Sequence, residues 1–360
     1  MTKATTVLVT GANGFYGQFI VKLLHEKDDE VTEIRTFDTT PFVKNLDYTE
    51  TKEVRSIVGD ICNFSTLLNA CEKVDCVIHA ASVIDFSPNP DVKAMFQNNV
   101  KGTENIIEAC LQAKVDQLVY TSTVDVVVGK QRLAYAREMQ VDIPENPLFP
   151  AYAKSKYEAE AKVLQANGKI HKDGDGKLHT LALRSVATYG ENDPYYVTNC
   201  LKNAANTRGV LVRLGSGREF MQQMYVGNVA WAHLVARRAL KEHPEKTGGL
   251  PYFITDDTLP CNIFDFVEPF LLSRGFRLSD TRIPFWVIWI LYIMQQIVLA
   301  LLSPVYKPSN PMIPIQQVYY ACNTYVVNRK RASEILKYSP IYQSKDAMAG
   351  AAKYYSQVKL

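Results

Sequence analysis

A glycine-rich loop near the start of the chain constrains the fold more than any other stretch. Residues 7–9 form a short apolar run rich in β-branched side chains, which is typical of a buried strand. Three glycines follow, Gly11, Gly14 and Gly17. Residues 18–24 then carry apolar side chains at helical spacing. This order predicts a pyrophosphate cradle, because glycine allows close backbone approach and a helix N-terminus attracts anions.

Composition is compatible with one large α/β domain or two unequal lobes. The chain has 360 residues, of which 47% are hydrophobic and 21% charged. A net charge of +3, without a basic stripe, argues against nucleic-acid binding. The 7 cysteines form no C-x-x-C pair, so we expect a reducing compartment and neither disulfides nor a metal site. The first apolar run follows Met1 too closely for a signal peptide, so we expect the catalytic part to face the cytosol.

Strand-like and helix-like segments alternate through the first half of the chain. The predicted strands after the first are residues 31–38, 54–60, 75–81, 117–123 and 180–184. Such alternation predicts a doubly wound parallel Rossmann sheet in residues 1–191, with contributions up to about residue 255. The alternation weakens afterwards, and we expect residues 192–360 to form a smaller C-terminal substrate lobe. Ligands of such sheets bind beyond the carboxyl ends of the strands.

An acidic residue at the end of the second strand predicts the cofactor. Asp38 lies about twenty residues beyond the glycine loop, where a carboxylate can bind ribose hydroxyls. It would repel a 2′-phosphate, which favours NAD over NADP, although nearby Arg35 could weaken this preference. The alternative is that Asp38 only opens the next loop. Another strand-end residue, His79, is expected to be structural.

Tyrosine, lysine and hydroxyl side chains supply the predicted chemistry. Oxidation of an alcohol needs a group that accepts the hydroxyl proton. Tyr152 and Lys156 are four residues apart and share one face of a predicted helix, so the lysine charge can favour a phenolate. Thr123 ends the fifth strand and can hold the substrate oxygen. Ser122 is the second choice, because strand alternation turns it to the opposite face.

The spacing G-x-x-G-x-x-G resembles the short-chain dehydrogenase/reductase superfamily. More specifically, the chain resembles the 3β-hydroxysteroid dehydrogenase/Δ5-Δ4-isomerase family. The stretches that carry this resemblance are residues 99–103 (NVKGT), 119–123 (VYTST), 183–191 (LRSVATYGE), 225–233 (YVGNVAWAH) and 253–258 (FITDDT). Two departures are Ser185, where the family usually has proline, and Thr123, where it usually has serine.

The resemblance implies NAD-dependent oxidation of a steroid or sterol 3β-hydroxyl, with Tyr152 and Lys156 in the catalytic positions. It also implies the endoplasmic reticulum membrane, sometimes with mitochondria, and a homodimer. Together with the spacing arguments, it gives the predicted cofactor contacts Gly11, Asn13, Gly14, Phe15, Tyr16, Gly17, Asp38, Asp60, Ile61, Ala80, Ala81, Asn99 and Lys156. Asp256 and Asp257 lie where the resemblance suggests an isomerase function, with a solvated turn as the alternative.

Competing functions stay open at this stage. One is a sterol-4-carboxylate 3-dehydrogenase that releases carbon dioxide after oxidation. Another is a sugar-nucleotide epimerase or flavonoid-type reductase of the same fold, and a third is a non-catalytic membrane scaffold that senses the cofactor. The exact steroid, the physiological direction and the oligomeric state are not encoded in a recognisable motif.

Residues 283–303 form a second distinctive feature. The stretch is apolar on every side except at Gln295 and Gln296, and its length approaches the thickness of a hydrocarbon core. Three aromatic side chains suit an interfacial position: Trp286, Trp289 and Tyr292. The stretch predicts a membrane-associated helix that contacts lipid. A hydrophobic lid over a lipid substrate and a buried core helix are the alternatives.

Overall fold

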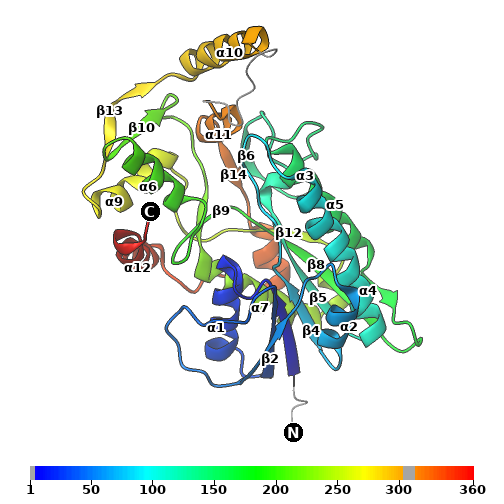
Figure 1. Cartoon of the computed structure of the whole chain (residues 1–360). Coiled ribbons are helices and arrows are strands. Elements are labelled where there is room, and N and C mark those ends of the chain that lie inside the picture. Colours follow the sequence, from blue (N-terminus) through cyan, green and yellow to red (C-terminus); the bar gives the residue numbers. More distant parts are fainter. Residues whose placement is uncertain (1–4, 303–312) are drawn as a thin grey trace.

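The computed structural model describes residues 5–302 and 313–360, and Figure 1 shows a twisted sheet wrapped by helices. Within these residues the main sheet has eight strands, seven of them in the parallel order β12-β8-β5-β4-β1-β2-β3, with β7 added antiparallel to β8. Its strands are β1 (Thr5–Thr10), β2 (Val31–Asp38), β3 (Glu53–Val58), β4 (Cys76–His79), β5 (Gln117–Thr123), β7 (Lys169–Ile170), β8 (Lys177–Ser185) and β12 (Pro251–Ile254). The predicted parallel Rossmann sheet is confirmed.

Helices cover both faces of the sheet because its buried strands alternate their side chains. Val7 and Ile78 pack with α1 and α7 on one face, whereas Leu8 and Val77 pack with α2, α4 and α5 on the other. These helices are α1 (Phe15–Lys27), α2 (Phe64–Cys71), α4 (Thr103–Ala113), α5 (Pro150–Gln165) and α7 (Val226–Glu242). A sheet buried on both sides therefore presents only its strand ends to a ligand.

Shorter elements complete the described chain. In the first part they are α3 (Val92–Met95), η1 (Phe96–Gly102), η2 (Val124–Val126), β6 (Leu133–Ala136), β9 (Ala187–Tyr189), α6 (Val197–Asn206), β10 (Val210–Leu214) and β11 (Gln223–Tyr225). Later come α8 (Pro244–Thr247), α9 (Ile263–Leu272), β13 (Arg277–Ile283), α10 (Phe285–Leu302), α11 (Ile315–Ala321), β14 (Tyr325–Val327), η3 (Ala332–Leu336) and α12 (Ser344–Gln357).

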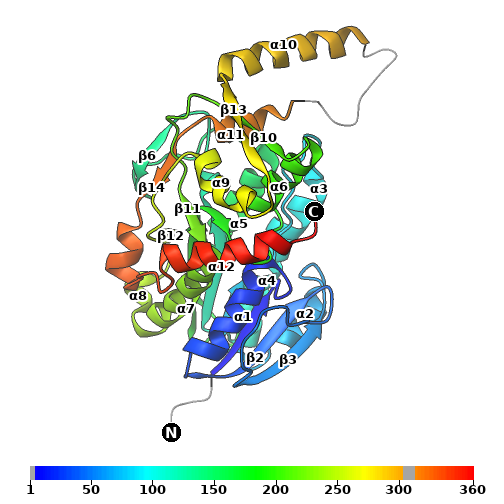
Figure 2. The same cartoon turned by 90° about the vertical axis from the view of Figure 1, so that its left-hand side faces the viewer.

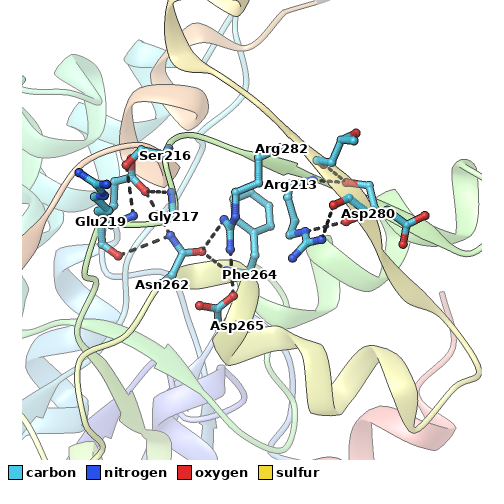
Figure 3. Close-up of polar contacts among 12 residues, drawn as sticks. Arg213, Ser216, Gly217, Glu219, Asn262, Phe264, Asp265, Asp280 and Arg282 are labelled. Carbon is cyan, nitrogen blue, oxygen red and sulfur yellow. Dashed lines mark hydrogen bonds and ion pairs between the residues drawn. The ribbon is translucent and has the colours of Figure 1, made fainter.

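A polar network holds the strand that leads into α10 (Figure 3). The Arg282 guanidinium donates to the Asp265 carboxylate over 3.1 Å and to the side-chain oxygen of Asn262 over 3.4 Å. Asn262 also caps α9, because its side-chain oxygen accepts from the Phe264 backbone N–H. On the neighbouring strand, Arg213 donates to two backbone carbonyls of the 279–280 segment. The strand β13, which leads into α10, is thus hydrogen-bonded to the start of α9 and to β10.

The apolar stretch 283–303 forms helix α10 over the described residues Phe285–Leu302, and Figure 2 shows it standing away from the sheet. Only Ile288 is buried among its 18 residues. Ile288 packs with Ile315 and Val318 of α11, and the Phe285 ring lies 4.8 Å from the Tyr319 ring. The core-helix alternative is therefore wrong, because one residue of the helix is buried and most of the others are exposed.

A buried ion pair joins Asp28, which follows α1, to Arg237 of α7. Asp28 follows α1, and its carboxylate accepts hydrogen bonds of 3.1 and 2.9 Å from the Arg237 guanidinium. Both side chains are fully buried. Breaking such a pair leaves one uncompensated charge in a medium of low dielectric constant.

We expect Arg237→Met to lower the free energy of unfolding by up to about 3–5 kcal/mol, because the buried Asp28 carboxylate loses its hydrogen-bonded partner and keeps only the Arg238 guanidinium, 3.7 Å away. Lys241→Met is the matched control, since Lys241 pairs with Glu30 at the surface and such pairs contribute less than about 1 kcal/mol. Denaturant unfolding of both variants measures the difference. Equal losses in the two variants would contradict a structural role for the buried pair.

Candidate active site

The glycine loop joins β1 to α1 with backbone contacts that exclude a side chain. Gly11 has φ +69°, and a Cβ there would lie 2.7 Å from the Ala81 backbone. A Cβ on Gly17 would lie 2.1 Å from the Gly11 carbonyl oxygen. Gly14 precedes α1 without a side-chain cap, and the first turn of α1 has no acidic residue. The N–H groups at this helix end therefore suit an anionic pyrophosphate.

Asp38 lies beside this loop at the carboxyl end of β2. Its carboxylate accepts from the Asn13 N–H over 2.9 Å and from the Thr39 N–H over 2.8 Å. Arg35 is buried instead among Glu33, to which its guanidinium donates, and the carbonyls of Ala70 and Glu72. The expectation that Arg35 could weaken the preference for NAD over NADP is wrong, because its guanidinium already pairs with Glu33 and with carbonyls at the end of α2.

The remaining predicted cofactor residues occupy neighbouring strand ends. Asp60 is exposed after β3, and buried Ile61 packs against the Gly102 backbone. The Ala80 and Ala81 N–H groups donate to Thr10. Phe15 and Tyr16 open α1 with their rings 5.4 Å apart. These residues border the same edge of the sheet as Gly11 and Asp38.

Asn99 holds the loop after β4 rather than lying free at that edge. Its side-chain oxygen accepts from the Val83 N–H and the Ser82 hydroxyl. Its amide group donates to the Val83 carbonyl and to Ser155 of α5. Asn99 therefore connects this loop to the helix that carries Tyr152.

The predicted catalytic side chains lie on two elements that pack together, Thr123 at the end of β5 and Tyr152 and Lys156 on α5. Thr123, Tyr152 and Lys156 are buried, with exposed fractions of 7, 5 and 3%. The Lys156 ammonium group donates to the Thr121 carbonyl over 2.7 Å and lies 4.3 Å from the Tyr120 ring centroid. Lys156 is thus held against the strand end by its neighbours.

Burial shapes the proton affinities of this group. It raises the pKa of the Tyr152 phenol well above its usual range, and the nearby Asp125 charge raises it further. Burial also lowers the pKa of Lys156 to about 7, opposed by the negative charge of Glu160. Both shifts favour the neutral forms of the two side chains, and the expectation that the Lys156 charge favours a phenolate stays a prediction.

The two hydroxyls at the end of β5 face different surroundings. Ser122 donates to the buried Glu160 carboxylate over 2.6 Å, and Glu160 also pairs with Arg184. Thr123 donates to the Asp125 carboxylate over 2.8 Å. The alternation expected for these residues thus separates them, and the choice of Thr123 over Ser122 as the hydroxyl that contacts the substrate stays a prediction.

Sequence reasoning missed Asp125, two residues beyond Thr123. Burial raises the pKa of its carboxyl to about 6. Its charge also raises the pKa of the phenols of Tyr16, Tyr152 and Tyr320. A carboxylate directly after the hydroxyl run was the available signal, but only the structure brings these phenols around it.

Aromatic side chains surround Tyr152. The centre of the Phe86 ring lies 5.1 Å from that of Tyr152, 4.7 Å from that of Phe149 and 6.5 Å from that of Tyr195. Tyr320 of α11 packs 5.8 Å from Phe149. The site therefore has an apolar wall, built from loops and from the helix that also contacts α10.

Ser185 changes the contact between the glycine loop and β8. The Tyr16 hydroxyl lies 3.2 Å from the Ser185 hydroxyl and 2.7 Å from that of Thr188. A proline at position 185 could not make this contact, so the departure from the family pattern adds a hydrogen bond between the two sides of the candidate site.

Three other residues that the sequence analysis considered, His79, Asp256 and Asp257, form hydrogen bonds or ion pairs within the protein. His79 bonds Thr10 and Thr103, and burial lowers the pKa of its imidazole to about 3, so its expected structural role is confirmed. Asp256 is buried and accepts from the Tyr225 N–H and the Asn228 amide. The next residue, Asp257, is exposed and pairs with Arg329.

Solved structures share this fold across nearly the whole chain. MoeE5 in complex with UDP-glucuronic acid and NAD is similar, with 20% identity, 97% of this chain and 98% of that chain covered, and a TM-score of 0.68. UDP-glucose 4-epimerase from Thermotoga maritima with UDP-glucose is also similar, with 16% identity, 98% of each chain covered and a TM-score of 0.68.

A short-chain dehydrogenase/reductase superfamily protein from Agrobacterium tumefaciens with bound NAD is a third neighbour. It has 18% identity and a TM-score of 0.66, with 98% of this chain and 97% of that chain covered. At these identities the likeness concerns the fold. A profile of the 3-beta hydroxysteroid dehydrogenase/isomerase family matches residues 8–285, which include the glycine loop, Thr123, Tyr152 and Lys156. The chain therefore belongs to the 3-beta hydroxysteroid dehydrogenase/isomerase family.

Proposed function

We propose that this protein oxidises the 3β-hydroxyl of a steroid or sterol to a ketone with NAD, at the endoplasmic reticulum membrane. The observation that carries the proposal is the burial of Thr123, Tyr152 and Lys156 beside aromatic rings that α11 links to an exposed apolar helix. An apolar wall suits a fused-ring substrate, whereas a sugar nucleotide requires many polar partners. Family membership supports the same reaction class.

The residues of the glycine loop fit NAD. The N-terminus of α1 would hold the pyrophosphate, and Asp38 would accept from the adenosine ribose hydroxyls. Bound NAD supplies the acceptor for the hydride that leaves the substrate carbon, together with a positive charge. Tyr152 would exchange the hydroxyl proton, and Lys156 would add a second positive charge on the same helix face.

Isomerisation of a Δ5 double bond is part of the proposal only as a second step. It requires a group that moves a proton between two carbons. Asp256 is occupied by backbone and amide donors and Asp257 by Arg329, so neither carboxylate is oriented by the described residues toward Tyr152. Oxidation is therefore the activity that the site supports best, with the decarboxylating sterol dehydrogenase as its nearest rival.

A mass-spectrometric screen of pregnene, androstene and 4-carboxysterol alcohols tests the oxidation. We expect a 3-ketone product with NAD and a loss of about 10²–10⁴-fold in kcat for Tyr152→Phe, because the phenol oxygen exchanges the substrate proton. Tyr157→Phe is the matched control, since Tyr157 is an exposed residue of the same helix.

Each product distinguishes one alternative. Carbon dioxide released only from a 4-carboxysterol would replace the leading proposal with its rival. A ketone that keeps the Δ5 bond would remove the isomerase step. Turnover of sugar nucleotides without steroid turnover would overturn the proposal as a whole.

Cofactor choice gives a separate prediction. We expect Asp38→Ala to raise the KM for NAD by about tenfold, because the carboxylate no longer accepts from the ribose, while the KM for NADP falls. Glu53→Ala, an acidic residue at the opposite end of the neighbouring strand, should change neither value. Steady-state kinetics with both cofactors measures the effect, and an unchanged NAD/NADP ratio would argue against Asp38 as the ribose ligand.

Helix α10 supports the membrane part of the proposal. Its 18 residues span about 27 Å and carry no charge, and Ile288 is the one that is buried. A helix that lies in the membrane surface has one polar face, which α10 lacks. The side-chain oxygen of Gln295 accepts a hydrogen bond from the Ile313 N–H, whereas its amide nitrogen has no partner among the described residues. We propose that α10 enters the hydrocarbon region beside α11 and the aromatic wall.

Lysines at the middle of α10 should prevent this insertion. We expect the double variant Ile293→Lys and Ile297→Lys to reduce the fraction of protein that floats with phosphatidylcholine vesicles by at least tenfold, because each buried ammonium costs about 2.5–3.5 kcal/mol. Leu259→Lys is the control, because Leu259 is 81% exposed but lies outside α10. Equal flotation of both proteins would contradict insertion through α10.

A further inference from the structure

Glu160 is a buried carboxylate one helical turn beyond Lys156 on α5. Residues four apart lie on one face of a helix, and the exposed fractions of Glu160 and Lys156 are 1 and 3%. A charge in such surroundings acts strongly on its neighbours, because a low dielectric constant screens it little. The orientation of this carboxylate therefore matters for the candidate site.

Two neighbouring strands hold the Glu160 carboxylate in place. Ser122 of β5 and Arg184 of β8 are directly paired in the parallel register of these strands. The Ser122 hydroxyl donates to one carboxylate oxygen over 2.6 Å, and the Arg184 guanidinium donates to both oxygens over 2.9 and 2.5 Å. The carboxylate accepts in all three bonds, as its ionised form does. Glu160 is thus fixed between α5 and the sheet.

Lys156 is the neighbour on which this negative charge acts. Its ammonium group donates to the Thr121 carbonyl over 2.7 Å, but a carbonyl orients the group without supplying a counter-charge. Burial lowers the pKa of Lys156 to about 7, and the Glu160 charge opposes this effect. Burial acting alone would favour the neutral amine more strongly.

Other titratable groups surround Lys156 without supplying a negative charge near pH 7. Burial lowers the pKa of the His79 imidazole to about 3, and it raises the pKa of the Tyr120 and Tyr152 phenols well above the usual range. Asp125 of η2 is bonded to Thr123. The charged residues of the remaining elements packed on α5 lie at or near the surface: Lys93 of α3, Lys101 of η1, and Glu104 and Glu108 of α4. Within residues 5–302 and 313–360, Glu160 is the carboxylate that raises the pKa of Lys156.

We infer that Glu160 is a positioning residue that supplies the buried counter-charge of Lys156 and so keeps its ammonium group protonated beside Tyr152 near neutral pH. The inference rests on the proposed alcohol oxidation. In that reaction the positive charge of Lys156 favours the Tyr152 phenolate, which takes the hydroxyl proton of the alcohol. A neutral Lys156 would leave the phenol protonated and unable to accept that proton.

NMR of ¹⁵N-labelled lysine Nζ atoms in the full-length protein, in detergent and without cofactor, measures this ionisation directly. The Lys156 signal is the one absent from Lys156→Met. We expect the pKa of Lys156 to be lower in Glu160→Gln than in the wild type by about one pH unit or more, because burial then acts without the opposing charge. Glu158→Gln is the matched control, since Glu158 is an exposed residue of the same helix that pairs with Lys162, and it should leave this pKa unchanged.

The pH profile of kcat/KM for the alcohol gives the functional readout. Activity falls on the basic side as Lys156 loses its proton, so this fall should begin about one pH unit lower in Glu160→Gln. Glu160→Asp keeps the charge and should restore the basic side of the profile. If Glu160→Gln does not fold because Arg184 is left unpaired, the double variant Glu160→Gln and Arg184→Gln removes both charges, and the same lowering is expected.

Two results would overturn the role of Glu160. One is a Lys156 pKa that is the same in Glu160→Gln and in the wild type. The other is a loss of kcat/KM at every pH without movement of the basic side, which would make Glu160 a structural residue alone. A wild-type enzyme that oxidises no 3-hydroxyl would overturn the proposed function, whereas the NMR titration still decides whether Glu160 controls the charge of Lys156.

Discussion

The parallel pairing of the central strands is the constraint on which the site depends. β1 pairs with β2 and β4, and β5 pairs with β4 and β8, all in the same direction. Their carboxyl ends therefore lie along one edge of the sheet. Gly11, Asp38 and Thr123 lie at that edge although they are far apart in sequence. Helices on both faces leave that edge as the place where a ligand can reach the strand ends. The buried Asp28–Arg237 pair holds two of these helices together.

Burial then sets the chemistry of this edge. Burial raises the pKa of Tyr152 and lowers that of Lys156 to about 7, because low-dielectric surroundings favour the neutral form of each side chain. Asp125 adds a negative charge among these phenols. Such a charge is costly in a buried site, and its hydrogen bond to Thr123 is the contact that offsets this cost.

Helix α11 connects this chemistry to the exposed apolar helix. Its Tyr319 ring contacts Phe285 of α10, whereas the adjacent Tyr320 ring packs on Phe149 beside the site. Gln317 of the same helix donates to the Phe86 carbonyl over 3.4 Å. A continuous chain of contacts therefore joins α10 to the residues beside Tyr152. Under the proposed function, this arrangement brings an apolar substrate and the catalytic group to neighbouring parts of the fold.

The sequence by itself determined six strands of the main sheet, the glycine loop and the family, because local periodicity and motif spacing encode them. It predicted β2 and β5 at their observed bounds, and it separated Ser122 from Thr123 by alternation. Only the tertiary structure decided the partners of Arg35, the exposure of α10 and the carboxylate bonded to Thr123. Those outcomes depend on which side chains pack together across long sequence separations, and on how far burial changes their proton affinities, which no local pattern records.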